Sequence, residues 1–423
     1  MTPSSRLAAI LDLLTEVESA PRPADAVTSA FFRARRHIDD QDRGAMLETL
    51  YAILRHRARL GWWLSRQGRA ETARGRLLAW LALGERKGPD QVARLFPTPL
   101  SAADSALVTA LHGSALDHAE MPEPVRLECP DWALEPLRRR FGADFAAEMA
   151  ATLVAPPLDL RVNPVKTSRD QALRGLSRLG LRAEPMALSP LGIRLPDRIS
   201  LALLPGLKSG EIEIQDEGSQ LVAHLVEAKP GERVVDFCAG AGGKTLALAA
   251  QMQNRGHLVA CDVNEARLKR CAERLRKAGL HNVETRVLAS ETDKWVKRHK
   301  GGYDRVLIDA PCSGTGTWRR NPDARWRAPD LGLSALMALQ ARILASAARL
   351  VRPGGRLVYA TCSVLVEENE AQVAAFLAAH PGFALLPLGE AFPPLQALGD
   401  HLSLTPKAHG TDGFFAAILT RQA

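Results

Sequence analysis

Closely spaced cysteines are absent from this sequence. Its six cysteines are spread along the chain, at Cys129, Cys238, Cys261, Cys271, Cys312 and Cys362. None of them forms a Cys-x-x-Cys pair, so the spacing predicts neither a zinc site nor a dithiol redox site. Six cysteines in 423 residues are also too few for a disulfide framework. We therefore expect no bound metal and reduced thiols.

Long apolar runs are missing as well. No run approaches the ~18–20 residues that cross a bilayer, and Asp12 and Glu16 interrupt the N-terminal apolar stretch, which argues against a signal peptide. Internal repeats and low-complexity tracts are lacking too. These absences predict a cytoplasmic protein without membrane contact. Because no long exposed apolar stripe stands out, we expect a monomer.

The length of the chain predicts two or three domains, since 423 residues exceed one ordinary hydrophobic core. Residues 1–130 carry apolar side chains at three- and four-residue spacing, as in "SRLAAILDLLTEVES" and "DRGAMLETLYAILRHRARLGWWLSR". They predict an all-helical domain in which Asp42 caps the second stretch. In residues 131–214, proline-containing segments, short strand-like runs and a helix predict a small α+β module.

Residues 215–423 alternate between strand-like and helix-like stretches. The strand-like runs are "RVVDFC", "HLVACD", "VETRVL", "RVLIDA" and "RLVYAT". This alternation predicts a doubly wound, Rossmann-like α/β domain, with a parallel sheet covered by helices on both faces. The last segments, "FALLPL" and "GFFAAILTR", are expected to close the sheet as a hairpin. In such a domain the functional edge lies at the carboxyl ends of the strands.

Two cysteines follow strand-like runs near this edge. Cys312 comes after "RVLIDAP" and Cys362 comes after "RLVYAT". A single cysteine at a strand end is most often a buried structural residue. Two of them at one edge, with Asp309 before the first, instead predict a shared pocket and covalent chemistry.

A glycine-rich loop, "DFCAGAGGKT" at residues 236–245, follows the first strand. A P-loop for ATP or GTP needs a glycine where Cys238 stands, and a dinucleotide loop needs a third glycine that is lacking here. The acidic Asp236 suits the ammonium and sulfonium groups of S-adenosylmethionine better than a pyrophosphate. Asp262, at the end of the second strand, is placed to accept hydrogen bonds from ribose hydroxyls. In the alternative interpretation, both aspartates only cap the following helices.

The formal net charge is +8. Arginines cluster immediately after the Cys312 segment, at Arg319, Arg320, Arg325 and Arg327. Because arginine holds phosphates through paired hydrogen bonds, this cluster predicts contact with a polyanion such as nucleic acid.

Several stretches together resemble one known family. They are "DFCAGAGGKT", "DAPCSGTGTWRRNPDARW", "YATCSVLVEENE" and "DGFFAAIL", with "PDWALEPLRRRFG", "LRVNP", "IQDEGSQLVA" and "DRGAMLETLYAILRHR" upstream. The chain resembles the RsmB/Sun family of RNA cytosine-C5 methyltransferases, bacterial enzymes that act on 16S ribosomal RNA. Its N-terminal region is similar to the NusB-like RNA-binding domain of that family.

The resemblance implies roles for individual residues. The Cys362 thiolate would add to C6 of a cytosine that is unpaired or flipped out, and Cys312 would help to break the adduct. Lys244 is a candidate for stabilising the thiolate, and Asp309 would contact either the N3 edge of the base or the cofactor. The expected S-adenosylmethionine site comprises Cys238, Ala239, Gly240, Ala241, Gly242, Gly243, Lys244, Asp262 and Asp309.

The sequence also departs from the family pattern. Ala241 stands where the family has proline, and the acidic residue expected after the third strand is absent or shifted to Ser290, Glu291 or Asp293. Other interpretations stay open: the same chemistry on transfer RNA or another RNA position, or a non-catalytic RNA-binding protein of ribosome assembly. An enzyme of the DNA cytosine methyltransferase type would use Cys312 as nucleophile and leave Cys362 without a role.

Overall fold

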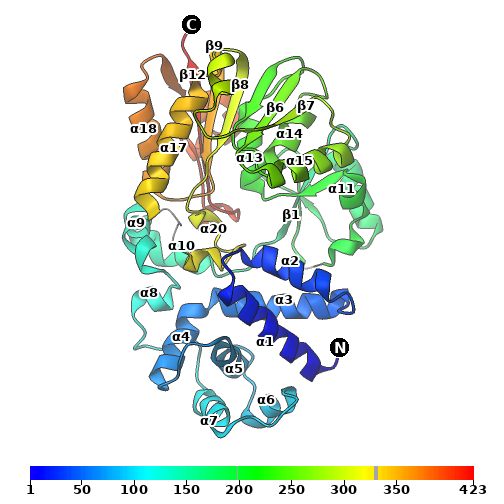
Figure 1. The fold of residues 1–423 in the computed structure, drawn as a ribbon, viewed down its shortest axis with the longest axis vertical. Helices are drawn as coiled ribbons and strands as arrows, with labels where there is room; N and C mark the ends of the chain where they lie inside the picture. The colour runs from blue at the N-terminus through cyan, green and yellow to red at the C-terminus, as the bar shows by residue number, and fades with distance from the viewer. Residues whose placement is uncertain (198, 328–331) are drawn as a thin grey trace. The chain divides into compact units, whose positions relative to one another are not determined.

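Two structural units share the chain, and one short segment of the second half belongs to the first unit. The computed structural model describes residues 1–197, 199–327 and 332–423 (Figure 1). The first unit comprises Met1–Val154 with Trp318–Ala328, and the second comprises Ala155–Thr317 with Pro329–Ala423. Residues 131–154, which the sequence pattern groups with the α+β module, are part of the first unit.

The first unit is built from helices over its described residues. They are α1 (Pro3–Ser19), α2 (Ala24–Ala34), α3 (Asp40–Arg55), α4 (Arg57–Arg66), α5 (Ala73–Leu83), α6 (Pro89–Leu95), α7 (Ala102–Leu111), α8 (Glu123–Arg126), α9 (Asp131–Phe141) and α10 (Phe145–Ala151). In α1, the Thr2 side chain caps the first turn, and apolar residues at three- and four-residue spacing from Leu7 to Val17 enter the core. The predicted helical periodicity is confirmed.

The stretch from Asp42 to Arg66 does not form one capped helix, which corrects the sequence prediction. It is divided between α3 and α4 at His56, and the buried Glu128 accepts hydrogen bonds from the backbone N–H groups of Ala58 and Arg59, which start α4. The cap of α3 is Asp39. Asp42 lies inside the helix, where its carboxylate is buried against the N-terminal ammonium and Arg6.

The arginine cluster after the Cys312 segment is a structural part of the first unit. Arg325 is fully buried, and its guanidinium donates hydrogen bonds to the Glu128 carbonyl and the Thr152 hydroxyl and stacks on the Trp318 ring. Arg327 donates to the Arg22 carbonyl. The prediction that this cluster holds a polyanion is therefore wrong for Arg325, because no part of its side chain reaches the surface.

The second unit contains a mixed sheet of the predicted kind. Its strands are β5 (Arg233–Asp236), β6 (His257–Asp262), β7 (Val283–Val287), β8 (Tyr303–Asp309), β9 (Val351–Thr361), β10 (Phe383–Leu386), β11 (Leu402–Leu404) and β12 (Phe414–Arg421). The order is β10-β12-β9-β8-β5-β6-β7, with β11 beside β12. The strands from β5 to β9 pair in parallel, and β12 is antiparallel to β9 and to β10. The two closing segments therefore pair as antiparallel strands, but residues 387–413 separate them, so they do not form the expected hairpin.

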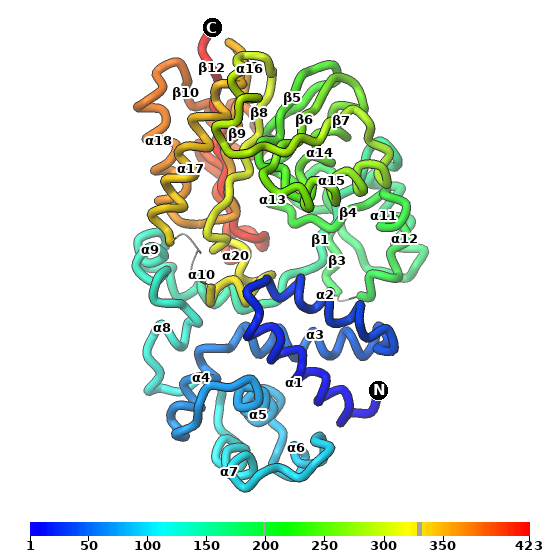
Figure 2. Tube along the Cα trace, in the orientation of Figure 1, coloured from blue at the N-terminus to red at the C-terminus, as the bar shows by residue number. Residues whose placement is uncertain are grey.

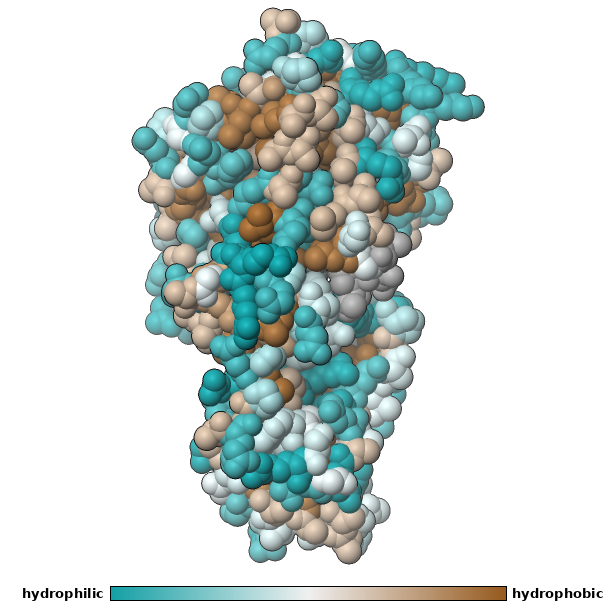
Figure 3. Space-filling model, turned by 90° about the vertical axis from the view of Figure 1, so that its left-hand side faces the viewer, coloured by the Kyte–Doolittle hydropathy of each residue, from teal (hydrophilic) through white to brown (hydrophobic). Residues whose placement is uncertain are grey.

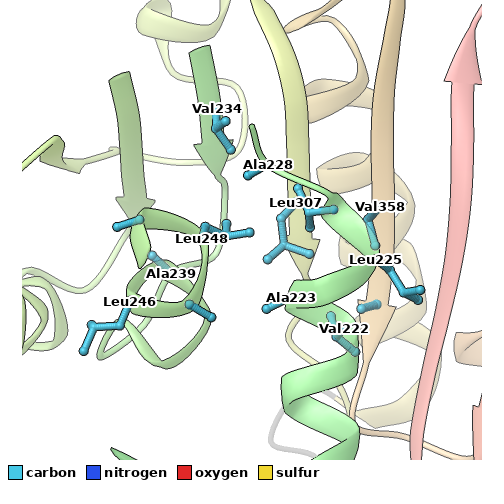
Figure 4. Close-up of a cluster of buried hydrophobic side chains, with 14 of the residues drawn as sticks. Val222, Ala223, Leu225, Ala228, Val234, Ala239, Leu246, Leu248, Leu307 and Val358 are labelled. Carbon is cyan, nitrogen blue, oxygen red and sulfur yellow. The ribbon is translucent and has the colours of Figure 1, made fainter. Parts of the chain in front are cut away.

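Helices cover both faces of this sheet. They are α13 (Glu217–Val226), α14 (Gly243–Gln251) and α15 (Glu265–Ala278) on one face, and α16 (Lys294–Arg298), α17 (Gly332–Ala348) and α18 (Glu370–Ala379) on the other (Figure 1; α16 is labelled in Figure 2). Side chains of successive strand residues alternate between the two cores. Val234, Leu307 and Val358 pack against α13 and α14 in the core of Figure 4, whereas Val235, Val306 and Tyr359 face α17. This alternation fixes the register of each strand.

A smaller sheet precedes the large one in the second unit. Its strands, in the order β2-β3-β1-β4, are β2 (Glu184–Pro185), β3 (Gly192–Leu195), β1 (Leu158–Val162) and β4 (Ile212–Ile214). All three pairs are antiparallel, and α11 (Arg169–Arg178) and α12 (Pro205–Ser209) accompany them (Figure 2). The short helices α19 (Leu388–Ala391) and α20 (Pro406–His409) lie before β12.

Apolar and hydrophilic residues are interspersed on the face that Figure 3 draws. Within the described ranges, no helix is both long enough and apolar enough to cross a bilayer.

Candidate active site

A cavity of about 700 Å³ lies at the carboxyl ends of β5, β6, β8 and β9. The strand order reverses between β5 and β8, and open α/β sheets bind their ligands at such a point. Of the residues predicted to form the site, Cys238, Ala239, Gly240, Ala241, Gly243, Lys244, Asp262, Asp309, Cys312 and Cys362 line the cavity. One predicted residue, Gly242, does not line it. A Cβ at Gly242 would lie 2.4 Å from the Cys271 sulfur, so this glycine serves the close packing of the loop on α15.

The two sulfur atoms of Cys312 and Cys362 are 3.4 Å apart. β8 and β9 are parallel neighbours, and Asp309 at the end of β8 pairs with Ala360 next to the end of β9, so the loops after them leave the same edge. The backbone N–H of Gly316 then donates to the Cys362 carbonyl at 3.0 Å. Two thiols that are 50 positions apart in the sequence therefore face one cavity, as the strand pattern predicts.

Gly316 keeps the Cys312 loop close to the chain that enters β12. A Cβ at Gly316 would lie 2.2 Å from the Gly413 carbonyl oxygen, a distance that real Cβ atoms do not reach. The Gly413 N–H donates to the Gly316 carbonyl at 2.7 Å. The two glycines thus allow backbone to pack directly on backbone beside the sulfurs.

Lys244 and Asp309 form an ion pair in the cavity wall. Lys244, in the first turn of α14, is buried, and its Nζ is 2.7 Å from Asp309 Oδ2. Burial acts to lower the pKa of Lys244, but the charges of Asp309 and Cys362 and the hydrogen bond to Asp309 outweigh it and leave the pKa above its usual value. Lys244 is therefore a permanent cation on the Cys362 side of the cavity.

The surroundings of Cys312 disfavour its thiolate form. Its hydrogen bond with Cys362, its burial and the nearby charges of Cys362 and Glu368 hold the pKa of Cys312 well above the usual range. Cys312 is therefore a thiol near neutral pH, whereas the reactive form of cysteine is the thiolate. This argues against the interpretation in which Cys312 is the nucleophile.

Asp262 supports the glycine-rich turn rather than capping α15, whose cap is Asn264. Its Oδ2 accepts a hydrogen bond from Gly240 N–H at 2.8 Å and its Oδ1 accepts one from Asn264 N–H at 2.7 Å. Each carboxylate oxygen has a second lone pair, so Asp262 keeps acceptor capacity toward the cavity.

The segment after the third strand, β7, contributes Ser290 and Glu291 to the cavity wall. Glu291 is held by Arg342, whose Nε is 2.7 Å from Oε1. Asp293 instead caps α16 by accepting from Trp295 N–H, also accepts from Ala289 N–H in the preceding turn, and is not a lining residue. Sequence reasoning missed the apolar part of the wall, Val263, Leu288, Leu339 and Ile343, because isolated apolar residues carry no motif signal.

Asp236, the last residue of β5, lies fully buried beneath the glycine-rich turn. Its Oδ2 accepts a hydrogen bond from the Thr245 hydroxyl at 2.6 Å, and Oδ1 has no hydrogen-bond partner. Burial raises the pKa of Asp236 to about 7, against the lowering effect of the Thr245 hydrogen bond. The Asp236 carboxyl group therefore accepts a hydrogen bond from the Thr245 hydroxyl of α14 and does not line the cavity.

We expect the stability contributed by Asp236 to fall as the pH rises from about 4 to about 7. The folded protein keeps the Asp236 proton up to about pH 7, while the unfolded chain releases it near the ordinary aspartate pKa of 3.8, so higher pH favours unfolding in this window. Asp236→Asn mimics the protonated acid at every pH and so removes the pH dependence of stability that Asp236 contributes. Urea unfolding at pH 4.5 and 7.5 measures this effect. Between these two pH values the free energy of unfolding of the wild-type protein should fall by about 3 kcal/mol more than that of the variant. Equal losses in both proteins would contradict the assignment.

Comparison with known proteins gives consistent matches. Residues 223–420 match a family model described as 16S rRNA methyltransferase RsmB/F, and residues 129–202 match the ferredoxin-like domain described for RsmF/B-like methyltransferases. The probable ribosomal RNA small subunit methyltransferase B of Synechocystis sp. is 35% identical over 72% of this chain and 70% of its own. The ribosomal RNA small subunit methyltransferase B of Photorhabdus laumondii is 33% identical over 69% of this chain and 66% of its own. The chain thus spans about two thirds of the length of these relatives.

Solved structures agree with the fold. The crystal structure of PH0851 superposes with a TM-score of 0.81 at 26% identity, covering 99% of both chains. A methyltransferase homolog protein from Pyrococcus horikoshii superposes with a TM-score of 0.61 at 28% identity, covering 71% of this chain and 97% of that one.

Proposed function

Because this chain belongs to the RsmB/F family of 16S rRNA methyltransferases, we propose that it methylates C5 of a cytosine in 16S rRNA through a transient bond between Cys362 and C6 of the base. The observation that carries this proposal is the pair of sulfurs 3.4 Å apart at the edge of the cavity. A covalent route needs one thiol to attack and a second group to assist release, and the cavity presents two unequal thiols.

The cofactor is S-adenosylmethionine, which supplies an electrophilic methyl group. The residues of the cavity fit it: the turn from Ala239 to Gly243 offers backbone without bulky side chains, and the free lone pairs of Asp262 suit ribose hydroxyls. Val263, Leu288 and Ile343 provide an apolar wall for the adenine ring. Ser290 and Glu291 take the place of the acidic residue that the family has after the third strand.

The remaining side chains act on the base. Addition of the Cys362 thiolate to C6 makes C5 enamine-like, and the Lys244 cation favours that thiolate. Asp309, fixed by Lys244, accepts a hydrogen bond from the exocyclic N4 amino group beside N3 of the cytosine and so orients the base. After C5 has been methylated, solvent water takes the C5 proton, the electron pair of that C–H bond re-forms the C5–C6 double bond, and the C6–S bond breaks to return the Cys362 thiolate, with Cys312 assisting this release. The base enters unpaired or flipped out of its helix, and we assign RNA docking to the NusB-like helical unit.

Methyl transfer to undermodified RNA tests this function. The purified protein is incubated with tritiated S-adenosylmethionine and with 16S rRNA or small subunits from a strain lacking the enzyme. We expect 5-methylcytidine at one position of 16S rRNA and none in a transfer RNA control. Label in transfer RNA would favour that substrate, and absence of label despite bound cofactor would favour a non-catalytic assembly factor.

A further inference from the structure

Glu368 is a fully buried carboxylate behind the two cysteine loops. It ends the short 3-10 turn Val366–Glu368 that follows β9. Oε1 accepts hydrogen bonds from Ser313 N–H at 2.8 Å and from the Gln340 side chain of α17 at 2.9 Å. Oε2 accepts from the hydroxyls of Ser313, at 2.5 Å, and Ser363. All four donors are neutral groups.

These contacts join the residues that directly follow the two reactive cysteines. Ser313 follows Cys312, Ser363 follows Cys362, and one carboxylate holds both. Thr315 strengthens the junction, because its hydroxyl lies 3.1 Å from the Ser363 hydroxyl and accepts from Val364 N–H at 3.1 Å. The relative position of the two sulfurs is therefore set through Glu368.

We propose that Glu368 is a positioning residue that clamps the Cys312 and Cys362 loops together and decides which sulfur attacks and which assists release. A buried charge is costly, and apolar packing would hold two loops equally well, so a carboxylate at this place points to an electrostatic task. This inference rests on the proposed function, in which the two thiols have different roles.

The charges around the cavity are arranged asymmetrically. Glu368 is among the groups that hold the pKa of Cys312 above its usual range, after the hydrogen bond to Cys362 and burial. Tyr359 of β9 also faces Cys312 and Glu368, and burial and both of these groups raise its pKa, so it is a neutral phenol. Lys244 and Asp309 face the cavity from α14 and β8, and Lys244 interacts with Cys362. A cation thus interacts with Cys362, whereas an anion opposes a Cys312 thiolate.

The substitution Glu368→Gln tests this role because it keeps the size and the acceptor oxygen but removes the charge. Alkylation by iodoacetamide is followed at each cysteine by peptide mass spectrometry between pH 6 and 10, without RNA or cofactor. We expect the Cys312 profile to move to lower pH, with alkylation at a fixed pH about tenfold faster than in the wild-type protein. The exposed Glu390→Gln is the matched control and should leave the profile unchanged.

An unchanged Cys312 profile in folded Glu368→Gln overturns the proposal. This outcome is distinct from failure of the proposed function, because the thiol measurement needs neither substrate nor turnover. If Glu368→Gln does not fold, the double variant Ser313→Ala with Ser363→Ala replaces it. This double variant removes the two hydroxyl contacts through which Glu368 holds the cysteine loops, so the Cys312 profile should depart from that of the wild-type protein, and a profile equal to wild type overturns the proposal.

Discussion

Cys362→Ala is expected to form no covalent adduct with RNA that carries 5-fluorocytosine at the target position, whereas Cys312→Ala accumulates one. Fluorine at C5 cannot leave as a proton does, so the wild-type adduct is trapped after methyl transfer. Removing the attacking sulfur should lower methyl transfer by at least about 10³-fold. Without Cys312, attack proceeds but release slows, so an adduct with ordinary cytosine should also persist. Denaturing gel electrophoresis of the protein–RNA complex measures both results.

Cys129→Ala is the matched control for this pair. Cys129 is a buried cysteine of the helical unit and does not line the cavity, so its variant should form the fluorocytosine adduct as the wild-type protein does. The opposite pattern, with the adduct lost in Cys312→Ala and retained in Cys362→Ala, would reverse the two roles. It would favour the mechanism of the DNA cytosine methyltransferase type.

Lys244→Met is expected to lower the rate of adduct formation about 10²-fold, because it removes the cation beside the Cys362 thiolate. It also leaves Asp309 without its ion-pair partner. Asp309 is only partly buried, so we expect a loss of about 1–3 kcal/mol in the free energy of unfolding, less than for a fully buried pair. Single-turnover trapping on fluorocytosine RNA and urea unfolding measure the two effects.

Two further variants separate the effect of the Lys244 charge on the trapping rate from its effect on the free energy of unfolding. Lys244→Met combined with Asp309→Asn should regain part of the lost stability, since no unpaired charge remains, but should not regain the rate. Lys269→Met on α15, where the lysine is 71% exposed, is the matched control and should change neither quantity. A trapping rate in Lys244→Met within twofold of wild type would remove Lys244 from the mechanism.

The fold of the second unit could be predicted from sequence because its strands are buried on both faces. Runs such as "RVLIDA" and "RLVYAT" have an uninterrupted apolar centre, which is typical of a parallel sheet between two layers of helices. The meeting of Cys312 with Cys362 was predictable for the same reason, since parallel strands end at one edge. Local spacing carries this information without any knowledge of distant contacts.

Other features could not be predicted from local spacing. The helical stretch is divided into α3 and α4 at His56. The start of α4 involves Glu128, whose carboxylate accepts a hydrogen bond from Ala58 N–H, 70 positions earlier in the chain. Arg325 has the pattern of a phosphate-binding residue, yet its partner Glu128 is 197 positions away and buries it. Gly242 has the pattern of a ligand-binding glycine, yet the Cys271 sulfur occupies the space where its Cβ would lie.

By itself the sequence determined the strand and helix layers and the position of two thiols and a glycine-rich turn at one edge of the sheet, because these follow from spacing within short stretches. The family was indicated by the resemblance of its motifs. Only the tertiary structure decided which charges surround each sulfur: Lys244 comes from α14, and Glu368 reaches Ser313 across 55 positions. The acidity of a thiol depends on burial and on charges within a few ångströms, and no local pattern specifies either.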